Sequence, residues 1–268
     1  MIGNAIRYGV LLLALLIAGG TIYVVYTEHL PCASPIEYRL GSFDTRFGIS
    51  QEAFLSDAAK ASSIWSMSAG EALFVYNPEA KLTVNLIYDE RQQNTELGAS
   101  ISVQQEAYDR QKARVDALEA AYDAHLSAFN QQVSYWNSRG GAPPKVYNDL
   151  EATKASLEAE LDSLNAAIDA LNALVRTTNA DVAVYNQNAG TEFEQGDYRR
   201  DSSGERIDVY EFDSTTKLVR LLAHEFGHAL GLEHNGTPSS IMYALNTGTN
   251  LSLSAADLAD LRTLCRLN

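Results

Sequence analysis

Two histidines and a glutamate in the C-terminal part of the sequence have the spacing of a metal site. His224 and His228 are four residues apart, so on a helix they lie on one face, one turn apart. Two imidazoles at that spacing can bind one zinc ion. Glu225 follows the first histidine and is placed to reach a water molecule on that metal. This segment is therefore the first candidate for a catalytic centre.

A third histidine completes the expected ligand set. His234 is six residues past His228, which is the wrong spacing for the same helical face. Gly231 lies between them, and glycine readily adopts the left-handed angles that end helices, so the chain can turn there and bring His234 back to the metal. Three protein ligands leave a fourth position for water, as in catalytic zinc sites. We expect one zinc ion per chain.

The eleven residues from His224 to His234 resemble the signature of the metzincin class of zinc endopeptidases. Residues 240–243, Ser-Ile-Met-Tyr, resemble the methionine turn that follows the third ligand in that class. The resemblance implies that Met242 packs beneath the zinc site. It also implies that peptide bonds are hydrolysed by a zinc-bound water, with Glu225 as the general base. The alternative interpretations of the motif are a structural metal site and a helix that carries surface histidines by chance.

The N-terminal segment predicts export. Residues 8–26 carry no charge and are rich in Leu, Ile and Val, and a helix of that length nearly crosses a hydrocarbon core of about 30 Å. Arg7 precedes this run, so the rest of the chain should lie outside the cytoplasm, in a periplasmic or extracellular location. A cleaved signal peptide is the competing interpretation and would make the protein secreted. The length of the run favours an uncleaved anchor, and we assign residues 1–31 to this segment.

The two cysteines, Cys32 and Cys265, lie near the two ends of the exported part. Outside the cytoplasm two cysteines are expected to form a disulfide, which would tie the start of the folded domain to its last helix. Two other roles for Cys32 stay open at this point. Prodomain cysteines of matrixins, a metzincin family, cap the zinc, but the residues around Cys32 lack the rest of that motif. A lipid modification is the other.

The composition fits an exported globular protein and argues against nucleic-acid binding. The formal net charge is −14, the sequence pI is about 4.7, and 46% of the residues are hydrophobic. Phosphate contacts need clusters of Lys and Arg, which an acidic chain without basic runs does not supply.

The segments on either side of the middle of the chain predict an α+β domain. Strands are expected at 35–43, 73–76, 81–88 and 206–212, and helices from Ser50 to about Met67, from Ser214, and over 254–267. This order resembles the matrixin-type catalytic domain. We therefore expect a mixed twisted sheet with a zinc helix and a C-terminal helix, formed by residues 32–98 and 187–268.

The middle of the chain, residues 99–186, predicts an inserted antiparallel coiled-coil hairpin. It is almost free of Gly and Pro except for a cluster at 140–144, which predicts a turn between two long helices. Apolar residues from Leu157 to Tyr185 follow alternating three- and four-residue steps, which is a heptad pattern. His125 falls on the corresponding seam and is expected to pack there rather than to bind metal. Substrate selection, partner docking, self-association and a rigid spacer are the candidate roles of this hairpin.

The resemblance also implies where a polypeptide substrate binds. In matrixins an extended substrate pairs with the edge strand above the zinc helix, and residues 206–212 are the expected edge strand here, with Ile207 and Val209 as tentative contacts. Tyr243 would border the side-chain pocket, but no proline follows it, which departs from the usual matrixin pattern. Calcium stays open: a polar cluster at 197–205 contains acidic residues whose spacing matches no known calcium loop.

The leading hypothesis is a membrane-anchored zinc metalloendopeptidase that acts outside the cytoplasm. Two alternatives remain at the level of sequence. One is a coiled-coil interaction protein whose zinc domain binds without cutting, although Glu225 would then have no role. The other is an amidase acting on cell-wall peptides.

Overall fold

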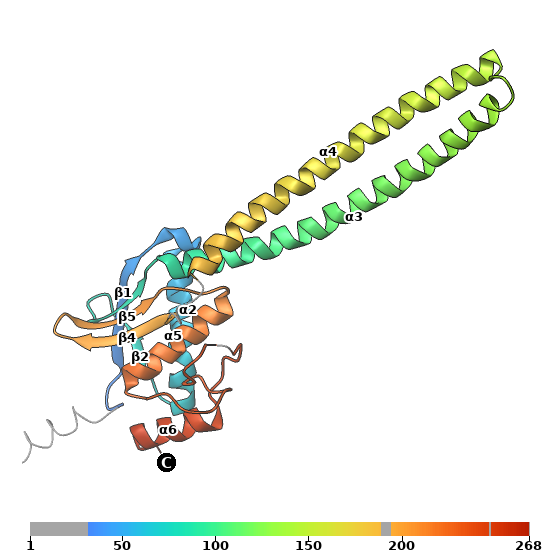
Figure 1. Ribbon diagram of the computed structural model, residues 1–268. Helices are drawn as coiled ribbons and strands as arrows, with labels where there is room; N and C mark the ends of the chain where they lie inside the picture. The colour runs from blue at the N-terminus through green and yellow to red at the C-terminus, as the bar shows by residue number, and fades with distance from the viewer. Residues whose placement is uncertain (1–31, 189–193, 247, 268) are drawn as a thin grey trace, which may run out of the picture. The chain divides into compact units, whose positions relative to one another are not determined.

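A computed structural model describes residues 32–188, 194–246 and 248–267. The described chain divides into two compact units, one containing residues up to Thr95 and from Glu194 onward, the other containing Glu96 to Asn188. The elements of the first unit are shown in Figure 1 together with the long helices. In chain order they are β1 (Ile36–Phe43), the 3-10 turn η1 (Thr45–Phe47), α2 (Gln51–Ala69), β2 (Phe74–Tyr76), β3 (Leu82–Leu86), β4 (Gly196–Asp201), β5 (Gly204–Val209), α5 (Thr215–Leu230) and α6 (Ala255–Cys265).

The first unit is built on a five-stranded sheet in the order β2-β1-β3-β5-β4. The first four of these strands are parallel, and β4 pairs antiparallel with β5. The mixed α+β architecture expected from the sequence is therefore present. One strand was not predicted: β4, whose residues look like a polar loop in the sequence.

The position of β5 corrects one prediction. Residues 206–212 were expected to form the edge of the sheet, but β5 lies between β3 and β4, and β4 is the edge strand. The side chains of Ile207 and Val209 are fully buried in the core, so they do not present an edge to a substrate. β4 precedes the turn at residues 201–204 and pairs antiparallel with β5, which follows the turn, so β4 covers the outer side of β5.

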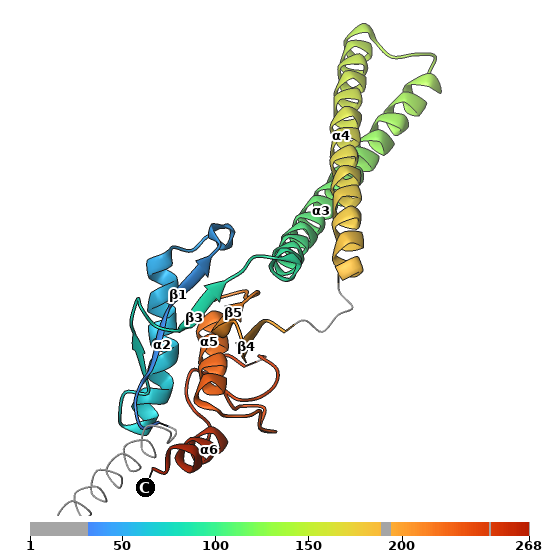
Figure 2. The same cartoon turned by 90° about the vertical axis from the view of Figure 1, so that its left-hand side faces the viewer.

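The helices α2 and α5 pack against each other, as Figure 2 shows. Ser50 caps α2 by accepting a hydrogen bond from the Ala53 amide, and Gly70 ends it in the left-handed region. The buried indole of Trp65 in α2 donates a hydrogen bond of 2.7 Å to the carbonyl of Ala223 in α5. Apolar side chains from both helices and from the inner strands form one core that fixes the position of α5.

A disulfide joins Cys32 to Cys265 at the end of α6. Cys32 is therefore not free to cap a metal or to carry a lipid. The predicted anchor at residues 8–26 lies outside the described residues. Within residues 32–188, 194–246 and 248–267, no helix is both long and apolar enough to cross a bilayer.

The second unit consists of most of α3 (Glu90–Asn137) and α4 (Pro144–Asn188), which form a helical hairpin (Figure 1). Side chains from both helices meet in a small core of Val115, Leu164 and Ala167, flanked by Leu118 and Leu171. The seam also contains polar contacts, including one from Gln104 Nε2 to Asp181 at 2.6 Å and one from Gln111 Nε2 to the Ala167 carbonyl at 3.0 Å. His125 is exposed and contacts Glu160 at 2.9 Å.

The hairpin begins earlier in the chain than the sequence indicated. Its first helix starts at Glu90 rather than near Ala99, and residues up to Thr95 belong to the first unit. The helix-forming composition does not mark this boundary, because the boundary between the two units falls within one continuous helix.

Candidate metal centre and cleft

The helix α5 presents the first two histidines and ends where the third must return. Ser214 caps its start by accepting a hydrogen bond from the Lys217 amide. Gly231 ends it with φ of 102°, a left-handed angle that favours glycine, and its amide donates to the His228 carbonyl at 2.9 Å. This turn brings His234 back beside the helix, as its spacing required.

The three imidazoles converge on one point. The distance between Nε2 atoms is 3.1 Å from His224 to His234, 3.1 Å from His228 to His224 and 3.2 Å from His228 to His234. Three nitrogens bound tetrahedrally to zinc at about 2.0–2.1 Å would be separated by roughly 3.3–3.4 Å. The observed triangle is close to this size, so the donor set and its geometry fit zinc. Within the described residues, these three histidines form the cluster of His, Cys, Asp or Glu side chains whose ligand atoms lie close enough together to hold a metal ion.

Two main-chain carbonyls orient the ligands. Nδ1 of His224 lies 2.7 Å from the Ile241 oxygen, and Nδ1 of His228 lies 2.8 Å from the Leu232 oxygen. A carbonyl only accepts, so each Nδ1 donates and each Nε2 keeps its lone pair for a metal. Burial lowers the pKa of His224 to about 4 and also lowers the pKa of His228. Both rings are therefore neutral, and ready to bind a cation, at neutral pH.

Met242 forms the floor of the site. It is fully buried, and a β-carbon on Gly227 would overlap its sulfur and lie 2.9 Å from the Trp65 ring. Gly227 is thus required between the two helical histidines because the methionine turn and α2 approach the helix closely there. This arrangement agrees with the role that the sequence resemblance implied for Met242.

Asp257 in α6 fixes the methionine turn. Its carboxylate accepts hydrogen bonds from the amides of Ile241 at 2.9 Å and Met242 at 3.1 Å, from the Ser240 hydroxyl, and from the Ser254 amide at 2.8 Å. Burial favours the neutral acid, but these hydrogen bonds outweigh it and lower the pKa of Asp257. The charged carboxylate therefore connects the last helix to the floor of the metal site.

Glu225 lies beside the triad in a nearly dry environment, with 3% of its surface exposed. Burial raises its pKa to about 8, and the nearby charges of Asp197 and Glu194 act in the same direction, while a hydrogen bond from the Tyr198 amide lowers it. A divalent cation at the triad would favour the charged form again. The carboxyl group is thus placed to exchange a proton near neutral pH.

A cleft of about 710 Å³ surrounds the triad and Glu225. One side is formed by residues 194–198, which comprise the start of β4 and the two residues before it; we call these five residues the cleft rim. Part of the lining follows the methionine turn and consists of residues 244–246. Tyr243, the predicted pocket residue, is half-buried and forms a bridge with Asn235, while its neighbours Ala244 and Leu245 line the cleft.

Arg220 is a residue of the site region that the sequence interpretation missed. It is fully buried on α5, one turn before His224, and donates to Asn246 Oδ1 at 3.0 Å and to the Ser240 carbonyl. Lys217, one further turn back, donates to the Asn246 carbonyl at 2.7 Å. Burial lowers the pKa of Arg220. Arg220 and His224 are four residues apart on α5, so they lie on the same face of the helix. This spacing could have indicated from the sequence that Arg220 is near the metal site.

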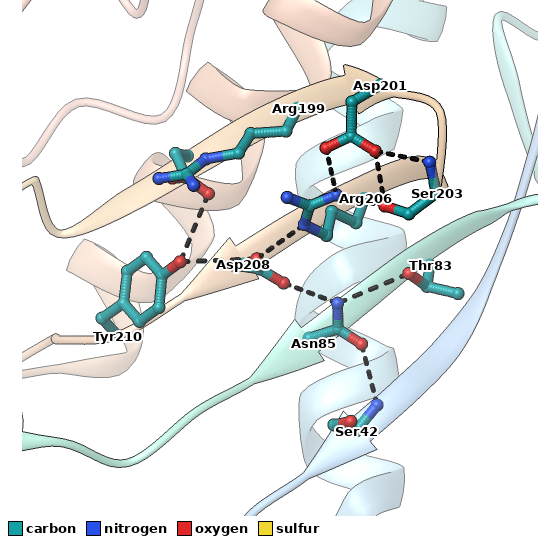
Figure 3. A network of polar contacts seen from close by, with 10 residues as sticks. Ser42, Thr83, Asn85, Arg199, Asp201, Ser203, Arg206, Asp208 and Tyr210 are labelled. Carbon is teal, nitrogen blue, oxygen red and sulfur yellow. Dashed lines mark hydrogen bonds and ion pairs between the residues drawn. The ribbon is translucent and has the colours of Figure 1, made fainter.

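The polar cluster considered for calcium forms a network across β3, β5 and β4 instead (Figure 3). Asp201 accepts from Arg206 at 2.8 Å, and Asp208 contacts Arg206 at 3.3 Å and Asn85 at 2.6 Å. Asp197 is paired with Arg199. The carboxylates of this cluster that lie on strands are therefore engaged by arginines and an amide, and they do not form a loop.

The chain shares its metal-binding region with known proteins. Residues 179–265 match the family model of the matrixins. The "Probable matrix metalloproteinase 095L" of Invertebrate iridescent virus 3 is 38% identical over 66 residues, which is 24% of this chain and 18% of that relative. The chain thus matches less than a fifth of that relative's length. The match and the histidine triad together show that this chain contains a matrixin-like metzincin domain of the zinc metallopeptidases.

Proposed function

We propose that this protein is a zinc-dependent endopeptidase that cleaves polypeptides. One observation carries the proposal: three Nε2 atoms lie within 3.2 Å of one another beside the buried carboxyl group of Glu225, in a cleft bounded by an edge strand. A structural metal site has no need of a buried acid at its open side. The matrixin match over the same residues supports the assignment.

The histidine triad and Glu225 have different roles in the proposed hydrolysis. Zinc held by the triad would supply Lewis-acid polarisation of the scissile carbonyl and of the attacking water. His224 and His228 hold their lone pairs toward the centre because two carbonyls fix their Nδ1 atoms. Glu225, as a carboxylate, accepts the proton of the attacking water and transfers it to the leaving amine. Zinc would favour the carboxylate before the first step, and the burial of the group would favour the protonated form between the two steps.

The substrate is proposed to lie along β4. This strand pairs with β5 on one side and ends the described sheet on the other, so its outer main-chain groups are available to an extended peptide. Such pairing binds the substrate main chain and demands little of its sequence. The side-chain preference then depends on residues 244–246, whose position Arg220 and Lys217 fix through Asn246.

The first test is cleavage of denatured casein by the purified full-length chain in mild detergent. We expect cleavage in the presence of zinc, and loss of cleavage both in Glu225→Ala and after chelation. The Glu225→Ala variant should still bind about one zinc per chain. A folded, zinc-loaded wild-type protein that cleaves neither casein nor a broad peptide library would contradict the peptidase assignment and favour a binding-only domain or a narrower amidase.

We further propose that the domain acts outside the cytoplasm, attached through residues 8–26. The charge-free run after Arg7 supports this location, and so does the disulfide, a bond typical of oxidising compartments. In intact cells, protease added from outside, after permeabilisation of an outer membrane where there is one, should degrade the domain. Protection of the domain until the cytoplasmic membrane is lysed would contradict the proposal.

The hairpin is proposed to bind a second copy of the chain or a protein partner. Leu161 and Ile168 are seven residues apart on α4 and remain 38% and 36% exposed. Two helices alone leave such a stripe uncovered, whereas a larger bundle buries it. Light scattering of the wild type and of a Leu161→Glu/Ile168→Glu variant tests self-association. A wild type that stays monomeric and captures no partner through these residues would leave the hairpin as a spacer.

A further inference from the structure

Arg91 is held rigidly at the start of α3, within the first unit. Its guanidinium forms a bidentate pair with Asp89, with nitrogen–oxygen distances from 2.5 to 3.1 Å. The Asp89 carboxylate also accepts a hydrogen bond from the Arg91 amide at 3.0 Å, so the same acid caps the helix and fixes the arginine. Only 20% of the Arg91 side chain is exposed.

The other face of this guanidinium contacts two parts of the structure next to the metal cleft. Its Nη1 donates a hydrogen bond of 2.9 Å to the carbonyl of Glu194, the first residue of the cleft rim. The Cζ atom of Arg91 lies 3.3 Å from the centre of the Tyr210 ring, which is a close cation–π contact. Arg91 therefore bridges the start of the hairpin and the rim.

Tyr210 extends this bridge along the rim. Its amide donates to the Gln195 carbonyl at 2.9 Å, and its hydroxyl lies 3.5 Å from Asp197 Oδ1 and 3.4 Å from Asp208 Oδ2 (Figure 3 shows the hydroxyl and Asp208). Through Arg91 and Tyr210, three of the five rim residues are connected to one fixed point. The start of the rim is also held by the Glu211 amide, which donates to the Gln195 carbonyl at 3.2 Å, and by the pairing of Gly196 with Val209. Within the described residues, the contact from Arg91 is the one that fixes the carbonyl of Glu194.

The rim has chemical importance because it faces Glu225. Residues 194–198 and Glu225 line the same cleft, and the charges of Asp197 and Glu194 act on the Glu225 carboxyl group. The rim continues into the edge strand that we propose binds the substrate main chain. A shift of the rim would therefore change both the substrate register and the environment of the general base.

We propose that Arg91 is a positioning residue for catalysis, which sets the cleft rim against the metal site by way of the Glu194 carbonyl and Tyr210. The effect on cleavage rests on the proposed peptidase function, whereas the effect on the rim itself does not. Because Arg91 belongs to the first turn of α3, that turn of the hairpin is functionally part of the cleft.

The chain offers a matched control in Arg46. It also pairs bidentately with an aspartate two residues earlier, Asp44, and it also stacks on a tyrosine, Tyr88, at 4.4 Å. Its side chain is 59% exposed, and it does not line the cleft. A comparison of Arg46→Ala with Arg91→Ala therefore separates the general effect of losing an Asp–Arg–Tyr cluster from the specific effect of losing the contact with the rim.

The test compares full-length, zinc-loaded wild type with Arg91→Ala, Arg91→Lys and Arg46→Ala. In hydrogen–deuterium exchange, Arg91→Ala should speed exchange of the amides of residues 195–198 by about fivefold or more, with the α5 amides unchanged. Arg91→Lys keeps the charge but loses the planar fork, so it should show an intermediate effect. Arg46→Ala should leave these amides as in the wild type.

The kinetic readout uses an extended peptide substrate. Arg91→Ala should raise KM by about fivefold or more with a smaller effect on kcat and with zinc content unchanged, since substrate main-chain binding is weakened. Unchanged exchange at residues 195–198 in Arg91→Ala, or equal changes in Arg46→Ala, would overturn the proposal. If Arg91→Ala does not fold, Arg91→Lys decides the question by the same readouts. A wild type without peptidase activity would refute the proposed function alone, because the exchange measurement still tests the anchor.

Discussion

His224 donates its Nδ1 hydrogen to the main-chain carbonyl of Ile241 across a distance of 2.7 Å. The amide of the same Ile241 donates to Asp257 at 2.9 Å. One peptide segment thus connects a metal ligand to a buried carboxylate of the last helix. The orientation of the ligand consequently depends on a residue that does not touch the metal site.

We expect Asp257→Ala to weaken zinc binding. Loss of the carboxylate leaves the Ile241 amide without its acceptor and the Met242 amide with only the Ser240 hydroxyl oxygen, so the methionine turn and the His224 ring are held less firmly. Changes in the outer shell of metal sites lower affinity by about 10–100-fold. Competition with a chromophoric chelator measures this effect. Asp260→Ala, an exposed position on the same helix, should retain wild-type affinity; equal affinities in all three proteins would contradict the linkage.

The metal-free protein should lose stability as the pH rises from 6.5 to 8. Burial raises the pKa of Glu225 from 4.5 to about 8, so across this window the folded state keeps a proton that the unfolded chain has released, and the free energy of unfolding falls. His224 has its pKa lowered from 6.5 to about 4, so its opposing effect operates below pH 6.5. The expected difference is roughly 1–2 kcal/mol.

Urea unfolding of chelator-treated protein at pH 6.5 and pH 8 checks this prediction. Glu225→Gln should remove the difference, because it has no proton to release. Zinc should also reduce it, since a cation beside Glu225 favours the carboxylate at both pH values. A wild type that is equally stable at both pH values without metal would show that the Glu225 carboxyl is better solvated than its burial indicates.

Substitution of Arg220 by Leu should change the cleavage preference and lower stability. The change removes the donor to Asn246 Oδ1 and the Ser240 carbonyl, and leaving such buried oxygens unpaired costs about 1–3 kcal/mol. Residues 244–246 then lose part of their anchorage, so the side-chain preference at the cleft should broaden. Mass-spectrometric profiling of cleaved peptide libraries measures the preference. Lys217→Met, which loses only the contact with the Asn246 carbonyl, should have a smaller effect; an unchanged profile in Arg220→Leu would remove this role.

Replacement of residues 97–190 by a short Gly-Ser bridge should leave a folded, zinc-binding first unit. Arg91, Gln92 and Thr95, which belong to the first unit, keep their contacts with Glu194, Phe212 and Glu211 in this deletion. A longer deletion that starts at Glu90 should be less stable by several kcal/mol, because it removes these contacts, including the hydrogen bond that the Phe212 amide donates to Oε1 of the buried Gln92. Thermal unfolding and zinc content of the two proteins give the comparison. Loss of zinc binding in the shorter deletion would show that the hairpin supports the core.

The metal site could be predicted from the sequence because its geometry is local. The spacing of His224 and His228 on one helix, with a glycine turn before His234, needs no distant contact. β4 could not be predicted in this way, since an edge strand with one solvated side contains charged residues such as Arg199 and Arg200 and lacks an apolar alternation. Arg91 was equally hidden, because its partners Glu194 and Tyr210 are more than a hundred residues away. The inward position of β5 depends on the same missed strand.

The bond between Cys32 and Cys265 spans the entire inserted hairpin. A peptide-bond cut anywhere in that hairpin would leave two polypeptides that remain one covalent molecule. The amino-terminal fragment would keep α2 and its Trp65 contact, and the carboxyl-terminal fragment would keep the three histidines. A cut in the hairpin would therefore give a two-chain form in which the disulfide holds the two parts of the metal-binding domain together. The two chains would migrate as separate bands in gel electrophoresis only after reduction.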